Sequence, residues 1–234
     1  MLNTRLKICG ITRPQDAVLA AEFGADLLGL NFFKGPRKID FETAVAILNE
    51  TGRHTKTVQW VALVGGEKFA AETPAEVRAM RRALDACTFF QHYDTAAQLA
   101  SAFERLGNSF SKSIWLVRHV PSRESLRVIG ATIASLPFTP SGVVLDTASK
   151  SGLLGGTGHS FNWRWIAEAR DAGELEGFPP IILAGGLTPD NVAEAIRIAR
   201  PYAVDVSSGV EAPGKPGVKD PVKMRDFIQA AKSV

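Results

Sequence analysis

The chain has 234 residues, of which 45% are hydrophobic and 22% are charged, a balance typical of globular proteins. This length can bury a sizeable core without disulfides or a structural metal, and it suits one large α/β domain over residues 1–234. The net charge of +3 comes from scattered Lys and Arg. This pattern argues against a nucleic-acid-binding protein, and the absence of any run of about 18 apolar residues argues against a membrane protein.

Short apolar, β-branched runs alternate with longer segments of helical period along the whole chain. Eight of these runs predict strands, at residues 6–9, 27–33, 58–64, 88–91, 114–117, 143–146, 181–184 and 203–207. Strands that are apolar throughout are typical of parallel sheets buried on both faces. The chain therefore reads as βα units repeated eight times, with no change of composition that would mark a domain boundary.

Helix starts are marked between these strands. Thr73, Thr188 and Asp220 each precede a proline, an order that predicts an N-cap residue followed by the first helical position. Thr12 stands three residues before Gln15, which is the spacing of a capping box.

Two architectures accommodate such units. A doubly wound open sheet usually has about five or six strands, and its dinucleotide-binding form carries G-x-G-x-x-G after the first strand. Here the first predicted strand is followed by Cys9, Gly10, Ile11 and Thr12 instead. Eight units in one chain favour a single (β/α)₈ TIM barrel, in which functional groups gather at the C-terminal ends of the strands.

Small residues follow the last two predicted strands. Gly185 and Gly186 lie before a predicted helix, and Ser207, Ser208 and Gly209 are placed to open a short extra helix. Free N–H groups at helix starts attract anions, and the loops after strands seven and eight are the usual phosphate site of this fold. Ordinary turns would explain either cluster alone. Both clusters at the expected positions predict phosphate binding.

The connection after the sixth strand is long and rich in glycine. Residues 152–158 superficially resemble a P-loop, but no Lys-Ser/Thr follows Gly158, which argues against a nucleoside triphosphate site. A connection of this length is typical of a lid or a binding loop, and a surface insertion is the alternative.

Cys9 and Asp146 end the first and sixth predicted strands. A lone cysteine is most often a small buried hydrophobe, which is the interpretation for Cys87, and an aspartate here can simply cap the next turn. In a barrel, however, strands six, seven, eight and one are consecutive. We therefore expect Cys9 and Asp146 to flank the phosphate site from two sides, as a potential base and a potential acid.

Several motifs together resemble the phosphoribosylanthranilate isomerases. They are KICGIT at 7–12, LDT at 145–147, GGTG at 155–158, LAGGLTP at 183–189 and PYAVDVSSGVE at 201–211. They occur in order over most of the chain and are highly specific together. The resemblance implies a (β/α)₈ barrel that performs an Amadori rearrangement of an aminoaldose phosphate in tryptophan biosynthesis.

The resemblance also implies roles for residues. Asp146 is the general acid that protonates the ribose ring oxygen, and Cys9 is the general base that removes the C2 proton. Arg37 pairs with the anthranilate carboxylate, although a surface arginine is the alternative. The remaining substrate-binding residues that the motifs imply are Gly156, Gly158, Gly185, Gly186, Asp205, Ser207, Ser208 and Gly209.

These roles require Cys9 as a thiolate and Asp146 with a proton, the reverse of their ordinary pKa values of about 8.5 and 3.9. We expect burial to raise the pKa of Asp146 and nearby helix N-termini to lower that of Cys9. Because the chemistry is proton transfer alone, no cofactor or metal is expected. The expected partner is a small phosphorylated substrate, and both a monomer and a homodimer are compatible with the sequence.

The sequence departs from the family pattern on the side expected to hold the anthranilate ring. Gly35 and Lys38 replace a serine and an aromatic residue around Arg37, and His92 is followed by Tyr93 where a glycine is usual. His92 corresponds to a family histidine or is a structural residue. Two alternatives stay open: a related isomerase of histidine biosynthesis, which carries Asp where Cys9 stands, and a catalytically silent barrel. Two cysteines without disulfide or metal spacing, and no apolar leader, indicate a cytoplasmic protein.

Overall fold

The computed structural model describes residues 4–55, 57–65, 73–106, 113–147 and 161–234. In these residues eight parallel strands close into a barrel in the order of the sequence. The strands are β1 (Arg5–Ile8), β2 (Leu27–Asn31), β3 (Gln59–Val64), β4 (Cys87–His92), β5 (Ile114–His119), β6 (Gly142–Asp146), β7 (Ile181–Leu183) and β8 (Ala203–Val206). All eight predicted strands are confirmed, with bounds that differ by a few residues. Pairing of β1 with β8 closes the barrel.

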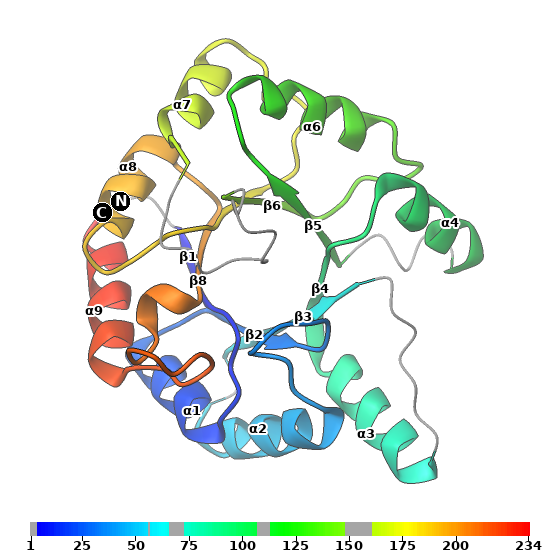
Figure 1. Ribbon diagram of the computed structural model, residues 1–234, viewed down its shortest axis with the longest axis vertical. Coiled ribbons are helices and arrows are strands. Elements are labelled where there is room, and N and C mark those ends of the chain that lie inside the picture. The colour runs from blue at the N-terminus through cyan, green and yellow to red at the C-terminus, as the bar shows by residue number, and fades with distance from the viewer. Residues whose placement is uncertain (1–3, 56, 66–72, 107–112, 148–160) are drawn as a thin grey trace.

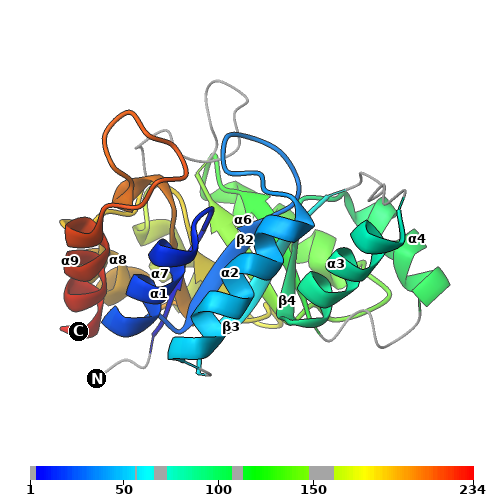
Figure 2. The same cartoon turned by 90° about the horizontal axis from the view of Figure 1, so that it is seen from below.

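Helices surround the strands on the outside (Figure 1). They are α1 (Pro14–Phe23), α2 (Phe41–His54), α3 (Pro74–Asp85), α4 (Ala96–Leu106), α6 (Glu124–Ala134), α7 (Arg164–Asp171), α8 (Val192–Ala199) and α9 (Pro221–Lys232), with the short 3₁₀ helix η1 (Ser208–Val210) after β8. The connections after β2 and β8 rise at one end of the barrel, and α9 ends at the other (Figure 2). In the described part of the chain no helix is long and apolar enough to cross a membrane.

Two buried clusters follow from the alternation of side chains along each strand. On β1, Leu6 and Ile8 belong to the cluster between the sheet and the helices, whereas Cys9 belongs to the cluster inside the barrel. On β3, Val61 and Leu63 likewise face the interior. Residues on the inner face of a strand therefore reach the centre of the barrel, and those near its C-terminal end reach the mouth.

The predicted helix caps are only partly confirmed. Thr73 forms a capping box with Glu76, and Asp220 accepts two backbone N–H groups at the start of α9. The prediction for Thr12 is wrong, because its hydroxyl donates to the carbonyl of Gly217 and α1 begins without a side-chain cap. The prediction for Thr188 is also wrong, since α8 begins only at Val192.

Candidate active site

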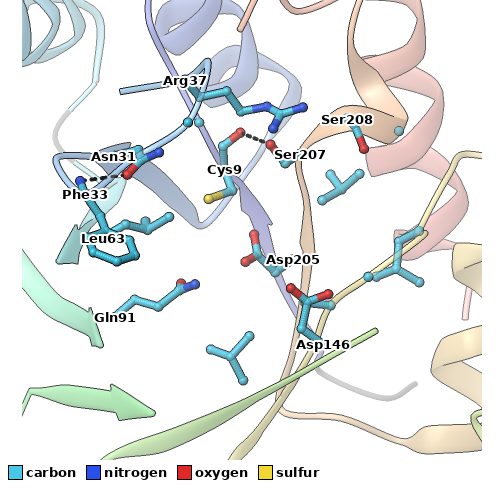
Figure 3. A pocket seen from close by; sticks show the side chains of 18 of the residues that line it. Cys9, Asn31, Phe33, Arg37, Leu63, Gln91, Asp146, Asp205, Ser207 and Ser208 are labelled. Atoms are coloured by element: carbon cyan, nitrogen blue, oxygen red, sulfur yellow. Dashed lines mark hydrogen bonds between the residues drawn. The ribbon is translucent and has the colours of Figure 1, made fainter. Parts of the chain in front are cut away.

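A cavity of about 510 Å³ opens at the C-terminal ends of the strands, where the barrel fold places functional groups. Its walls come from the ends of β1, β2, β4, β6, β7 and β8 and from the loops that follow them (Figure 3). Every described residue that the sequence predicted for the site lines it: Cys9, Arg37, Asp146, Gly185, Gly186, Asp205, Ser207, Ser208 and Gly209. Gly156 and Gly158 lie outside the described residues.

The thiol of Cys9 and the carboxylates of Asp146 and Asp205 face the same hollow (Figure 3). Cys9 follows β1 and donates its backbone N–H to the carbonyl of Val206 at 2.8 Å. Asp146 is the last residue of β6, and Asp205 lies in β8. The closed strand order thus brings together three acidic groups that are far apart in sequence.

Asp146 is held in a half-buried position that favours its protonated form. Burial raises the pKa of this carboxyl, and the charge of Asp205 adds to the effect, whereas His119 and the N–H of Thr147 lower it by less. This direction agrees with the expectation for a general acid. One carboxylate oxygen accepts the Thr147 N–H at 2.7 Å, so Asp146 also has the turn-capping contact that was the alternative interpretation.

Gly185 allows Asp146 this position. Its φ is +84°, and a Cβ there would lie 2.6 Å from Oδ1 of Asp146. Glycine adopts positive φ without steric cost and leaves room for close approach. The glycine of the β7 connection therefore also shapes the acid's surroundings.

The expectation that the pKa of Cys9 is lowered is wrong for the ligand-free protein. Burial raises the pKa of the thiol, the charge of Asp205 raises it further, and Lys7 and Lys219 offset only part of this. Helix N-termini are visible in the sequence, whereas the proximity of the Asp205 carboxylate on the neighbouring strand is not. The thiol therefore loses its proton less readily than an ordinary cysteine, and an additional positive charge close to it would favour the thiolate.

Lys7 lies behind the cavity wall, and the sequence motifs did not predict a role for it. It is fully buried and shares the inner face of β1 with Cys9. Its Nζ lies 2.8 Å from Oδ2 of Asp205, its register partner on β8. Alternation along the first strand places Lys7 inside the barrel, and a lysine at such a position was the available signal.

Arg37 lies in the loop after β2, and its guanidinium is held by a carboxylate of this chain. Its Nε and Nη2 donate to the two oxygens of Glu211 at 2.6 and 2.7 Å. Glu211 also accepts from buried Lys219 at 3.1 Å and from the Gly217 N–H at 2.9 Å. A guanidinium has five N–H donors, so this pairing orients Arg37 and leaves donors for a ligand.

The two glycine-containing loops reach the cavity side by side, as expected for an anion site. The predicted extra helix after β8 is confirmed as η1, which begins at Ser208. Ser207 donates its hydroxyl to the carbonyl of Cys9 at 3.2 Å, which ties this loop to the end of β1. Gly185 and Gly186, by contrast, precede the first residue of α8 by several positions, so they form the loop itself and not the helix start.

An aromatic wall closes another side of the cavity. Phe33 and Tyr93 stack with ring centroids 5.3 Å apart, and Gln91 donates to the Tyr93 hydroxyl at 3.2 Å. Asn31 shapes the turn that carries Phe33 by accepting its N–H at 2.9 Å. Of these lining residues, Tyr93 is one that departs from the pattern of the isomerases that the sequence resembles.

His92 is absent from this wall. Its Nδ1 lies 2.9 Å from Oδ2 of Asp94, and it does not line the cavity, which fits the structural interpretation. Across the described ranges, no group of three or more His, Cys, Asp or Glu side chains is arranged to hold a metal ion.

A parallel eight-stranded barrel whose mouth joins a thiol, a half-buried carboxyl and two small-residue loops defines an acid–base enzyme of the (β/α)₈ class. The model of the N-(5'-phosphoribosyl)anthranilate (PRA) isomerase family matches residues 116–230. The N-(5'-phosphoribosyl)anthranilate isomerase of Trichlorobacter lovleyi is 41% identical over 229 residues, which cover 97% of this chain and 98% of that protein. That of Myxococcus xanthus is 37% identical over 240 residues, which cover 100% and 98%. The chain belongs to the N-(5'-phosphoribosyl)anthranilate isomerase family.

Solved structures agree with this assignment. Phosphoribosyl anthranilate isomerase from Thermotoga maritima superimposes with a TM-score of 0.74 at 28% identity, covering 99% of this chain and 100% of that one. A second isomerase structure contains reduced 1-(o-carboxyphenylamino)-1-deoxyribulose 5-phosphate and has a TM-score of 0.71 at 29% identity, with the same coverage.

Proposed function

We propose that this protein catalyses the Amadori rearrangement of N-(5'-phosphoribosyl)anthranilate to 1-(2-carboxyphenylamino)-1-deoxyribulose 5-phosphate in tryptophan biosynthesis. The observation that carries the proposal is the cavity shared by the Cys9 thiol and the half-buried Asp146 carboxyl, in a chain of this family. The whole of residues 1–234 acts as one catalytic domain. Its two cysteines are free thiols, which suits the reducing cytoplasm.

The phosphate of the substrate binds between Gly185–Gly186 and the segment from Ser207 to Gly209. Both loops line the cavity, and backbone N–H groups at this edge of a barrel are suited to a phosphate. Anchoring the phosphate there lays the ribose across the mouth of the barrel, between the groups that carry out the proton transfers.

Asp146 gives its proton to the ribose ring oxygen. The bond from C1 to that oxygen breaks, and the lone pair of the anthranilate nitrogen forms an iminium with C1. Cys9, as thiolate, then removes the proton from C2 and leaves an enolamine. A proton taken up at C1 and one lost from the C2 hydroxyl yield the ketose. The iminium places a positive charge beside Cys9, which favours the thiolate at the step that needs it.

Asp205 is suited to contact the sugar. Its side chain is 7% exposed, Oδ2 is taken by Lys7, and within the described ranges Oδ1 has no hydrogen-bond partner. A buried carboxylate oxygen without a partner is costly, so a substrate hydroxyl that donates to Oδ1 would be bound favourably.

Arg37 and the aromatic wall recognise the anthranilate group. The donors of Arg37 that Glu211 leaves free pair with the anthranilate carboxylate. The ring of anthranilate packs against Phe33, which stacks on Tyr93.

The test is the loss of anthranilate fluorescence as freshly made substrate is consumed. Cys9→Ser and Asp146→Asn are each expected to abolish turnover while the protein stays folded. Cys87→Ser is the matched control, because Cys87 belongs to the cluster between sheet and helices, and it should keep the wild-type rate. A Cys9→Ser enzyme near the wild-type rate removes Cys9 from the mechanism. Turnover of only the histidine-pathway aminoaldose phosphate by the wild type overturns the proposal.

A further inference from the structure

We propose that Lys7 is a positioning residue for Cys9, whose buried ammonium, held in place by Asp205, stabilises the thiolate form of Cys9. This inference rests on the proposed role of Cys9 as the base and explains how a buried thiol can take it up.

The first support is the placement of the ammonium group. Lys7 on β1 and Cys9, the residue directly after this strand, are two positions apart and so point to the same, inner side of the barrel. Lys7 is fully buried, and its Nζ lies 2.8 Å from Asp205. The ammonium therefore occupies the layer directly beneath the thiol.

Gly29 on β2 shows that the ammonium and the thiol border the same space. A Cβ at Gly29 would lie 2.9 Å from the sulfur of Cys9 and 3.2 Å from Nζ of Lys7. Both atoms thus border the same small space over Gly29, and the missing side chain allows them to approach each other. The Lys7 charge and hydrogen bonding from Lys7 both act to lower the pKa of Cys9.

Lys7 keeps its proton in this environment. Burial acts to lower the pKa of the ammonium, but the charges of Asp205 and Cys9 outweigh it and raise the pKa above its ordinary value. A charge, and not a neutral amine, therefore stands beside the sulfur at neutral pH.

Stability alone does not account for a lysine at this position. A buried ion pair is often no more stabilising than well-packed apolar residues of similar volume, and β1 and β8 are already joined by four register pairs. The Lys7–Asp205 pair instead places a positive charge next to the sulfur of Cys9, which must carry a negative charge to remove the proton from the substrate.

The ionisable groups that act on Cys9 come from several elements. They are Lys7 on β1, Asp205 on β8, Lys219 in the segment before α9, Arg37 in the loop after β2 and Tyr93 after β4. Among the cations Lys7 is the one on the strand that leads to Cys9, and its effect on the thiol is the largest.

The experiment measures the thiol directly, without substrate. In a Cys87→Ser background Cys9 is the only cysteine, and its rate of alkylation by iodoacetamide is followed by intact mass between pH 6 and 11. Lys7→Met is expected to move the midpoint of this profile up by about one pH unit or more, so that the rate at pH 8 falls about tenfold. Asp205→Asn is expected to move it down, since this substitution removes a negative charge and keeps Lys7.

Opposite shifts distinguish electrostatics from loosened packing. A purely structural role for the pair would expose the sulfur in both variants and shift both midpoints in the same direction, which overturns the proposal. An unchanged midpoint in folded Lys7→Met also overturns it. If Lys7→Met alone does not fold, the double variant with Asp205→Asn leaves no unpaired charge. Its midpoint must then lie above that of Asp205→Asn.

Alkylation keeps this inference separate from the proposed function. If the alkylation midpoints of Lys7→Met and Asp205→Asn shift in opposite directions but the protein has no isomerase activity, the effect of Lys7 on Cys9 is supported. Only the proposed use of that effect in this reaction is then excluded. In an active enzyme, Lys7→Met should also move the basic limb of the pH profile of kcat/KM to higher pH. An unmoved limb contradicts the role in catalysis.

Discussion

Gly185→Ala tests whether the turn after β7 sets the position of the acid. The φ of Gly185 is +84°, and an L-residue in this left-handed region costs about 1–2 kcal/mol. The new Cβ would also meet Oγ1 and the backbone N of Thr147 and would stand 2.6 Å from Oδ1 of Asp146, whereas ordinary van der Waals contact begins at 3.4 Å. The turn that holds the carboxylate, Thr147 included, must therefore shift by about 1 Å, and a misplacement of this size can lower kcat about 100-fold.

Gly177→Ala is the matched control. Gly177 has a similar φ of +79°, but a Cβ there would meet no atom within 4 Å, and this glycine does not line the cavity. The control incurs the cost of positive φ without displacing a site residue. Its melting temperature should fall by roughly 2–8 °C, and its kcat should equal that of the wild type.

The assay is kcat from the fluorescence decrease, together with thermal unfolding of both variants. Gly185→Ala should lose stability at least as much as Gly177→Ala and should alone lose activity. A kcat of Gly185→Ala within about threefold of the wild type, or an equal loss in Gly177→Ala, would refute the claim that the absence of this side chain positions Asp146.

Three further substitutions test other parts of the site. Glu211→Gln removes the carboxylate that pairs with Arg37 and with buried Lys219, and it should lower the free energy of unfolding at pH 7 by about 3 kcal/mol in urea titrations. Burial acts to raise the pKa of Glu211, but Arg37 and the other donors outweigh it and lower it. Its contribution to stability is therefore present above about pH 4.3 and is lost as pH falls towards its folded pKa. Glu211→Gln should lack that acid-dependent loss, and an identical pH dependence would contradict this. His119→Gln removes a group that lowers the pKa of Asp146. Because the acid limb of the pH profile of kcat/KM reports the group of lower pKa, this limb should move to higher pH. An unmoved limb would show that His119 does not act on Asp146. Phe33→Leu removes the stacked ring and should raise KM about twofold to tenfold with kcat nearly unchanged, and an unaltered KM would exclude Phe33 from ring binding.

The strands were predictable because apolar β-branched runs have few other ways to be buried in a chain of βα units. Helix starts were less so. The Thr73 and Asp220 caps depend on neighbouring residues alone and were predicted correctly. Thr12 has the same local signal, but its hydroxyl donates to Gly217, which lies far along the chain. A local pattern does not report such a competitor.

The same division holds for the site. Its lining was predictable because every described candidate follows or ends a strand, and parallel strands of a barrel end at one edge. The pairing of those side chains was not. The direction of the pKa shift of Cys9 depends on Asp205, and the availability of Arg37 depends on Glu211.

The amino-acid sequence by itself determined the eight strands, the barrel and the residues at its mouth, because burial and alternation act between near neighbours. The tertiary structure decided which charges meet. Lys7 and Asp205 are 198 residues apart and Arg37 and Glu211 are 174 apart, and both contacts reach the last strand or the segment that follows it. Such contacts exist only once β8 has paired with β1, since that closure sets which inward-facing side chains share a layer.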